Sequence, residues 1–426
     1  MLTTIVAAAY LLLLGAGGAN LPYGIEWADL LAPLLLVSLA IDRGGFPRVA
    51  APLHRYVTLY VLSTVVCAIF SVDRRVSAVA AVKDLYLAAV YIAIVALAVR
   101  QRREWIAGFL AAGAAVTAAA GLVGVALAAA GIPLNRLGVR MAVPVVGTTF
   151  RPSGFLYSPE MLAELLTCTL PLMVWLALRR DHRWWAAVAV AAIAAALTVS
   201  HGLAGVLTAS LIVLWPVPGP IWRRARWLAA TAVVMFAIAL NVVSLVAIRD
   251  LSIAQGRTSL PPAAFSHAFD DPDGTVPTVD LHVAYSPMSY FALKKLAWAT
   301  FREHPWLGYG PGTFHLVTER AFGERRLPSL YRDTDPHSTW LGRLAETGLV
   351  GTAALAALWA ALLIAAARAT RAEGVGSDAH AYRAAILGML VNSINTDVMH
   401  FRFLWVVVGL IAAAASARAR EPAQSR

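Results

Sequence analysis

Charged residues and cysteines are both scarce in this sequence. Of its 426 residues 14% are charged, about half the share usual in soluble proteins, and two are cysteines, Cys67 and Cys168. Both cysteines lie in apolar runs, so we expect buried side chains rather than a disulfide or a set of metal ligands. RNA-recognition motifs, zinc fingers and basic helices are also absent. These absences exclude a disulfide-stapled secreted domain and argue against a nucleic-acid partner.

Apolar residues dominate the chain instead. Hydrophobic residues make up 59% of it and the mean hydropathy is +0.68, which excludes an ordinary cytosolic enzyme and a disordered protein. A helix needs roughly 20 apolar residues to cross a bilayer core, and about twelve segments approach that length. We therefore predict an all-α polytopic membrane protein, with spans near 2–18, 27–41, 54–71, 80–99, 105–131, 157–178, 184–200, 202–217, 228–248, 348–367, 381–397 and 402–418.

Basic residues in the short loops predict the orientation of these spans. Lysine and arginine outnumber the acids 35 to 24, and the net charge is +11. The arginines of alternate loops share one side, which is the cytoplasmic side if both termini are inside. The first span lacks a basic n-region, so we expect a retained helix and not a signal peptide. The arginines concerned are Arg43, Arg48, Arg55, Arg100, Arg102, Arg103, Arg179, Arg180, Arg183, Arg223, Arg224, Arg226, Arg368, Arg371, Arg418 and Arg420.

One long polar segment interrupts the spans. Residues 249–347 are rich in proline and include a turn-forming stretch at 270–274. A loop of this length is usually functional or disordered, but an amphipathic pattern over 289–303 predicts a helix that packs. We therefore divide the chain into residues 1–248 with the first nine spans, residues 249–347 as a large outer-face loop, and residues 348–426 with the last three spans and a basic tail.

Arginines are unexpectedly frequent on the outer face. Arg136, Arg140 and Arg151 lie in one outer turn, and Arg257 lies in the long loop. A guanidinium forks onto phosphate oxygens, so a cluster of arginines beside a membrane indicates a phosphate- or diphosphate-bearing lipid. The plainer alternative is solvated charge or contact with anionic head groups. Arg151, at the start of a span, is the arginine for which the functional interpretation is strongest.

His337 is the strongest candidate for a proton acceptor. It follows Asp335-Pro336 and precedes Ser338, where a short helix is expected to begin. A helix start beside the membrane favours a nearby anion, and imidazole can take a proton from a sugar hydroxyl near neutral pH. A surface or capping histidine is the alternative. Elsewhere, no cluster of His, Cys, Asp and Glu has metal-ligand spacing, and we expect no cofactor.

Several acidic residues stand close to the spans. Glu160 and Glu164 are one helical turn apart, so they share a face. They are expected to bind sugar or, as a structural role, to pair with Arg151. Lys83 and Asp84 have the same two interpretations. The glycine-rich stretch 308–314 lacks the Lys-Ser/Thr pair of a P-loop and predicts a turn whose backbone approaches protein or ligand closely.

Taken together, these motifs resemble the O-antigen ligase and polymerase superfamily of bacterial membrane glycosyltransferases. Four segments over roughly residues 150–367 carry the resemblance, in this order along the chain: Arg151-Pro152-Ser153-Gly154 with Ser158-Pro159-Glu160 and Leu170-Pro171-Leu172, then Thr198 to Gly202, then His304 to Phe314, then His337 to Leu341 with Glu346 to Gly351.

The resemblance implies a reaction and its residues. A glycan would pass from an undecaprenyl diphosphate carrier to a hydroxyl of lipid A-core, in a ligase, at the outer face of the bacterial inner membrane, among membrane lipids. His337 and Arg151 take the positions of the family's catalytic histidine and loop arginine, and no metal is implied. His201, Glu160, Arg257, Lys294, Arg136 and Arg140 are the residues predicted to bind the diphosphate or sugar.

The sequence departs from the family at three positions. His201 replaces an arginine, Glu160 replaces an asparagine, and Tyr290 stands where another arginine is expected. Arg257, Lys294 or Lys295 would then supply the missing charge.

Other functions remain open at this point. A repeat-unit polymerase of the same superfamily would use the end of another glycan as acceptor, and the compact motif around His337 favours the ligase slightly. A relative that glycosylates proteins and a scaffold that only binds polyprenyl lipids are further alternatives. About twelve spans also suit a transporter, but transporters often have inverted repeats and a midplane site, whereas the ionisable residues here gather at one face.

Overall fold

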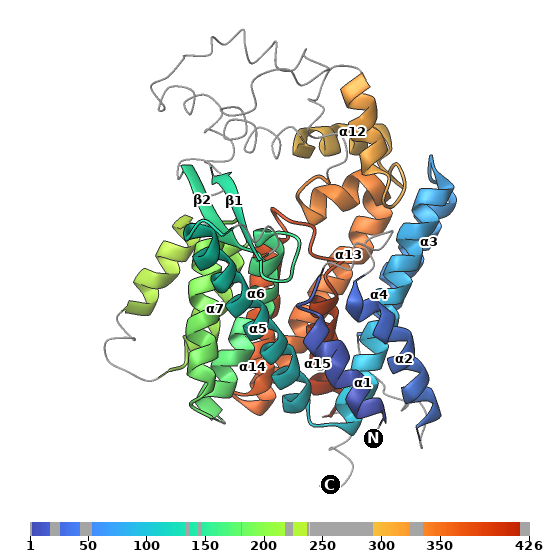
Figure 1. The fold of residues 1–426 in the computed structure, drawn as a ribbon. Helices are drawn as coiled ribbons and strands as arrows, with labels where there is room; N and C mark the ends of the chain where they lie inside the picture. The colour runs from blue at the N-terminus through green and yellow to red at the C-terminus, as the bar shows by residue number, and fades with distance from the viewer. Residues whose placement is uncertain are drawn as a thin grey trace, which may run out of the picture.

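The protein is a bundle of helices with one small hairpin (Figure 1). The computed structural model describes residues 2–17, 26–42, 53–132, 137–143, 147–179, 181–217, 225–236, 238, 293–323 and 335–417. The elements are α1 Leu2–Leu13, α2 Trp27–Ile41, α3 His54–Ile69, α4 Arg74–Arg100, α5 Arg103–Ala129, β1 Gly138–Val143, β2 Gly147–Pro152, α6 Pro159–Arg179, α7 Trp184–Thr198, α8 Leu203–Leu214, α12 Phe314–Gly323, α13 Thr339–Glu373, α14 Asp378–Asn392 and α15 Arg402–Ala417. Further helices cover Ala225–Phe236 and residues 293–303.

The mostly helical fold that the sequence predicts is confirmed. A helix overlaps each of the expected spans. Four of them, α4, α5, α6 and α13, are long and apolar enough to cross a membrane by length and composition, and others are shorter apolar helices. The full count of twelve spans and the domain boundaries stay predictions. The amphipathic helix expected at 289–303 is confirmed over residues 293–303.

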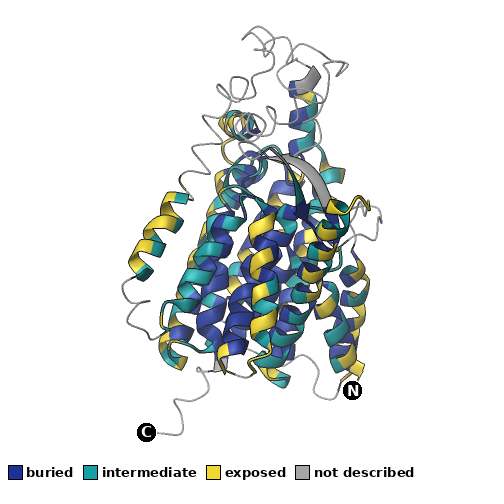
Figure 2. Cartoon of the chain, turned by 60° about the vertical axis from the view of Figure 1, so that its left-hand side comes forward, coloured by how far each residue is buried: buried dark blue, intermediate teal, exposed yellow. Residues whose placement is uncertain are grey.

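Helix α6 is the centre of the bundle. Almost all of its residues are buried, and it packs against α7, α8 and α14, while α15 packs against α4. Around this core the outward faces of the helices carry exposed apolar side chains, such as Leu62 at 55% and Ile193 at 54% exposure (Figure 2). An apolar exterior of this kind suits lipid, since monomeric soluble proteins rarely expose large apolar patches.

Several of the basic turns meet at one end of the bundle. Arg103, at the start of α5, forms ion pairs with Glu373 at 2.9 Å and with Asp378 at 3.3 Å. Arg179, at the end of α6, donates from Nε to the carbonyl of Gly376 at 3.1 Å. The turns that the sequence assigns to one side are therefore neighbours in space.

The opposite end carries a β-hairpin that the all-α prediction missed. Strands β1 and β2 are antiparallel, with Val139 opposite Arg151. The hairpin lies against α5 at a contact between two glycines, because a Cβ on Gly124 would approach the carbonyl carbon of Leu137 to 2.5 Å and one on Gly138 would approach that of Gly124 to 2.8 Å. This contact between two backbones fixes where β2 ends, and Arg151 lies at that end.

Helix α13 is kinked at Gly348, where φ is +59° and ψ is −156°. At the kink the N–H groups of Leu349 and Val350 bond to the carbonyls of Pro305 at 2.8 Å and Trp306 at 3.1 Å. The glycine-rich stretch lies against the same helix, since Tyr309 N donates to Ala345 O at 2.9 Å. The predicted close backbone approach is thus to protein. The expected tenth span at 348–367 begins at this kink, but the helix itself begins nine residues earlier, at Thr339.

We predict that Gly348→Ala destabilises the protein by about 3 kcal/mol or more. A positive φ is energetically unfavourable for alanine, and its Cβ would lie 2.4 Å from the carbonyl carbon of Trp306. The matched control is Gly374→Ala, where φ is +89° and nothing lies within 4 Å of the new Cβ. Thermal unfolding of the purified protein should show a larger loss for Gly348→Ala, and equal losses would contradict the packing at the kink.

Candidate active site at the hairpin end of the bundle

Segments distant in the chain meet beside the hairpin. The end of β2, the start of α6, the α7–α8 turn, the helix over 293–303, the segment 335–338 and the α14–α15 turn all contribute polar side chains. Five predicted site residues contact one another or affect one another's pKa there: Arg151, Glu160, His201, Lys294 and His337.

Arg151 is held by two different helices. Its Nε donates to the carbonyl of Thr198 at the end of α7, and its Nη2 lies 2.5 Å from Oε1 of Glu160 at the start of α6. The residue is 4% exposed. A cation at a helix C-terminus is favourable, and a buried guanidinium needs such partners. The pairing of Glu160 with Arg151, one of the two interpretations of this acid, is confirmed as a contact.

His201 lies in the turn between α7 and α8, next to this pair. Burial, and after it the positive charge of Lys294, lower the pKa of His201 to about 4, although the Glu160 carboxylate acts in the opposite direction. The imidazole is therefore neutral at neutral pH. A neutral ring has one N–H donor and one acceptor nitrogen, so it can hydrogen-bond to a sugar or to a phosphate oxygen without adding charge.

Lys294 brings a second cation to the same place. Its Nζ donates to Oδ1 of Asn395, in the α14–α15 turn, at 2.6 Å. Burial lowers the pKa of Lys294 from 10.5 to about 8, because a desolvated ammonium is less stable than a hydrated one. Lysine is thus still mainly protonated at neutral pH, and it would gain from an anion bound nearby.

His337 sits where the backbone turns into α13. Its φ is +47°, its N–H donates to Oδ1 of Asp335 at 2.6 Å, and its Nδ1 is 3.7 Å from the same oxygen. Burial lowers the pKa of His337 below 6.5, although Asp335 and Glu160 raise it. The imidazole is therefore a free base at neutral pH, next to a carboxylate that can orient it.

The residues after His337 anchor it to the end of α14. Ser338 caps α13, since its Oγ accepts from Leu341 N at 3.4 Å. Thr339 donates from its N–H to Ser393 O at 2.9 Å and from Oγ1 to Thr396 O at 2.9 Å. The helix start expected at His337 is found one to two residues later, and it opens the 35-residue helix α13 rather than a short helix.

Three predicted binding residues, Arg136, Arg140 and Arg257, are not placed in this cluster. Arg136 and Arg257 lie outside the described residues, and so does Tyr290. Arg140 belongs to β1, opposite Phe150. Among the described residues, no group of three His, Cys, Asp or Glu could hold a metal ion.

Sequence reasoning missed the polar residues after α14. The span expected at 381–397 ends at Asn392, and Asn395 and Asp397 lie in the turn beyond it. Asn392 is 1% exposed. Its Nδ2 donates to Oε2 of Glu164 at 2.7 Å, and its Oδ1 accepts from Gly205 N at 2.8 Å. Closely spaced polar residues near the end of an apolar run were the available signal.

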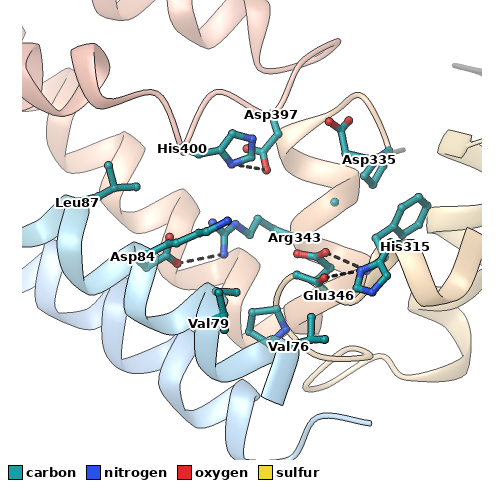
Figure 3. A pocket seen from close by; sticks show the side chains of 17 residues that line it. Val76, Val79, Asp84, Leu87, His315, Asp335, Arg343, Glu346, Asp397 and His400 are labelled. Carbon is teal, nitrogen blue, oxygen red and sulfur yellow. Dashed lines mark hydrogen bonds and ion pairs between the residues drawn. The ribbon is translucent and has the colours of Figure 1, made fainter. Parts of the chain in front are cut away.

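A cavity of about 470 Å³ has Asp335 and Pro336 in its wall (Figure 3). Its walls come from α4, residues 311–315, the start of α13 and the α14–α15 turn. The buried Arg343 lies at its base, with Nη1 3.3 Å from Oδ2 of Asp84 and Nη2 donating to the hydroxyl of Tyr60. Asp84, one of two charged residues predicted near the start of a span, therefore has an ion-pair partner.

Comparison with known proteins gives one family. A family model described as O-antigen ligase matches residues 186–356. No curated protein matches the chain. The matched range includes His201, Lys294 and His337 of the cluster, and it begins after Arg151 and Glu160.

We predict that Asn392→Asp destabilises the fold by about 3 kcal/mol, because it removes the Nδ2 donor to the buried Glu164 and buries a carboxyl group in its place. The matched control is Asn395→Asp in the turn that follows α14, which gives Lys294 an ionic partner and should cost no stability. Chemical or thermal unfolding of both variants makes the comparison. Equal stability of the two variants would show that the amide of Asn392 does not hold this end of the bundle together.

Proposed function

We propose that this chain, which is similar over residues 186–356 to a family model described as O-antigen ligase, belongs to the O-antigen ligase and polymerase superfamily and transfers a glycan from undecaprenyl diphosphate to an acceptor hydroxyl. The similarity supports a membrane glycosyltransferase of the O-antigen ligase or polymerase type. The finer proposal is a ligase, whose acceptor is lipid A-core. The site would face the outside of the bacterial inner membrane, with both termini in the cytoplasm.

One observation carries the proposal. His337, whose imidazole is deprotonated at neutral pH, shares its surroundings with two cations, the buried Arg151 and the half-buried Lys294. Transfer from a diphosphate needs a base for the incoming hydroxyl and positive charge for the leaving group. The cluster supplies both, and it lies at the end of the bundle opposite the basic turns, as an outward-facing site would under the positive-inside rule.

The proposed reaction has one displacement step. His337 takes the proton of the acceptor hydroxyl as that oxygen bonds to C1 of the lipid-linked sugar. The bond from C1 to the diphosphate oxygen breaks, and the diphosphate leaves with the electron pair. Arg151 and Lys294 stabilise its charge, the neutral His201 donates a hydrogen bond to it, and Asp335 orients His337. The proton on His337 then passes to solvent.

Glu160 has a positioning role in this scheme. It keeps Arg151 in place through the 2.5 Å contact between Oε1 of Glu160 and Nη2 of Arg151. Arginine suits this position because its planar fork can bond to a carboxylate and to a phosphate in fixed directions.

We expect deletion of the gene to leave long polymer stranded on the lipid carrier and absent from its final acceptor. The wild-type gene should restore the glycan, and His337→Ala should not. Electrophoresis of surface glycans together with extraction of lipid-linked glycans measures both pools. A final acceptor carrying single repeats would assign the chain to the polymerases instead, and normal glycans in the deletion strain would overturn the glycosyltransferase assignment.

With purified protein, His337→Ala should lower kcat/KM by about 10²–10⁴-fold. Arg151→Lys should lower it by about 10²–10³-fold, because lysine lacks the fork. Thermal unfolding of both variants checks that the fold survives. Full activity in a folded variant would remove that residue from the mechanism.

The pH dependence of kcat/KM should report the ionisation of both His337 and Lys294. His337 must be deprotonated, and its pKa lies below 6.5, so the acidic limb should lie below pH 6.5. Lys294 must be protonated, and its pKa is about 8, so activity should fall as the pH rises through about 8. An ordinary lysine would lose its proton only near pH 10.5.

Two variants identify the alkaline limb. Lys294→Arg keeps its charge to far higher pH and should abolish the fall near pH 8. Asn395→Asp should move that fall upward, since a carboxylate in place of the amide raises the pKa of Lys294. An alkaline limb that stays at the same pH in both variants would show that another group causes it.

A further inference from the structure

The cavity beside Asp335 differs in chemistry from the His337 cluster. Four of its lining residues are acids, Asp84, Asp335, Glu346 and Asp397, and its cations are Lys83 and Arg343. The Arg343 cation is already paired with Asp84 at 3.3 Å. A diphosphate would meet an excess of carboxylates here, and like charges repel. Carboxylate oxygens do accept hydrogen bonds from hydroxyl and ammonium groups.

Protein groups do not fully satisfy the guanidinium of Arg343, which is 7% exposed. Among the residues that the structure describes, Nε of Arg343 is buried and has no hydrogen-bond partner, whereas both Nη atoms have one. Leaving a buried donor unpaired is costly.

The size and the apolar walls also fit a small ligand. The volume of about 470 Å³ lies within the range of roughly 300–1,000 Å³ that ligand pockets have. Val76, Val79 and Phe314 contribute apolar surface among the polar groups. A sugar ring presents both kinds of surface, with C–H groups on its faces and hydroxyls around its rim.

The cavity adjoins the base of the proposed reaction. Asp335 and Pro336 form part of its wall, and Oδ1 of Asp335 accepts the N–H of His337 at 2.6 Å. A ligand in the cavity would therefore lie beside Asp335, which contacts His337.

We propose that this cavity binds the acceptor saccharide, and that it selects a neutral or amino-bearing sugar over an anionic one. The assignment rests on the proposed glycosyltransferase function. The donor diphosphate occupies the cationic cluster, the acceptor ring occupies the carboxylate-lined cavity, and Asp335 connects the cavity to His337. The carboxylates accept hydrogen bonds from hydroxyl or ammonium groups of the acceptor.

Protection of an introduced cysteine from chemical labelling tests whether the cavity binds a sugar, and the test does not require glycan transfer. Ala80 lines it, so Ala80→Cys should react with a water-soluble maleimide, while the native Cys67 and Cys168 are buried and should react slowly. The probes are the methyl glycosides of a hexose, a hexosamine and a hexuronic acid, with inorganic pyrophosphate as a fourth. The control is Val72→Cys, which is at the same end of the bundle, 54% exposed and outside the lining.

The hexoside and the hexosaminide should slow labelling of Ala80→Cys in a concentration-dependent manner and leave Val72→Cys unchanged. The hexuronide and pyrophosphate should have no effect. Protection by no sugar would overturn the saccharide site, and equal protection by the hexuronide would overturn its selectivity. Stronger protection by pyrophosphate than by the sugars would show that the cavity binds anions and would overturn the proposal. None of these outcomes depends on whether the chain transfers glycans, so failure of this assignment is distinct from failure of the proposed function.

A kinetic variant connects the cavity to the reaction. Ala80→Leu adds side-chain volume to the cavity wall and should raise the KM for the acceptor by about tenfold, the effect of losing roughly one good contact. The KM for the lipid-linked donor should stay unchanged. A change confined to the donor KM would place the donor in the cavity and would overturn the assignment.

Discussion

The buried amide of Asn392 holds together the end of the bundle that carries the candidate site. It bonds to the carboxyl of Glu164 in α6 and to the backbone of Gly205 in α8, and its own helix α14 ends in the turn that receives Thr339 and Lys294. An apolar bundle offers few partners for polar groups, so a buried amide with all of its partners fixes the relative positions of three helices. The places of His201, His337 and Lys294 all depend on it.

Charge is divided at this end of the protein. Arg151 and Lys294 belong to the cluster around His337, whereas four acids line the neighbouring cavity. The proposed transferase would use such a division, because one substrate carries a diphosphate and the other only has to present a hydroxyl. Electrostatic complementarity of this kind contributes more to selection between ligands than to affinity.

Backbone contacts position the same residues. The kink at Gly348 turns the N–H groups of α13 toward residues 305–306, which brings the segment after the 293–303 helix against α13. The hairpin lies on α5 through Gly124 and Gly138, and its second strand ends at Arg151. The site thus depends on places where two backbones approach more closely than side chains would permit, and glycine is required there.

The sequence by itself determined the helical, membrane-type character of the chain and the position of nearly every helix, and it gave His337, Arg151 and Glu160 as candidate site residues. These follow from hydropathy over about 20 residues and from short motifs, which are local properties. Only the tertiary structure decided that β1 and β2 pair, that Asn392 and Asn395 lie in the site rather than in a span, and that Arg343 joins Asp84 at the base of a cavity. Each of these depends on contacts between segments far apart in the chain, such as Asp84 and Arg343, and hydropathy along the chain carries no information about which distant segments will meet.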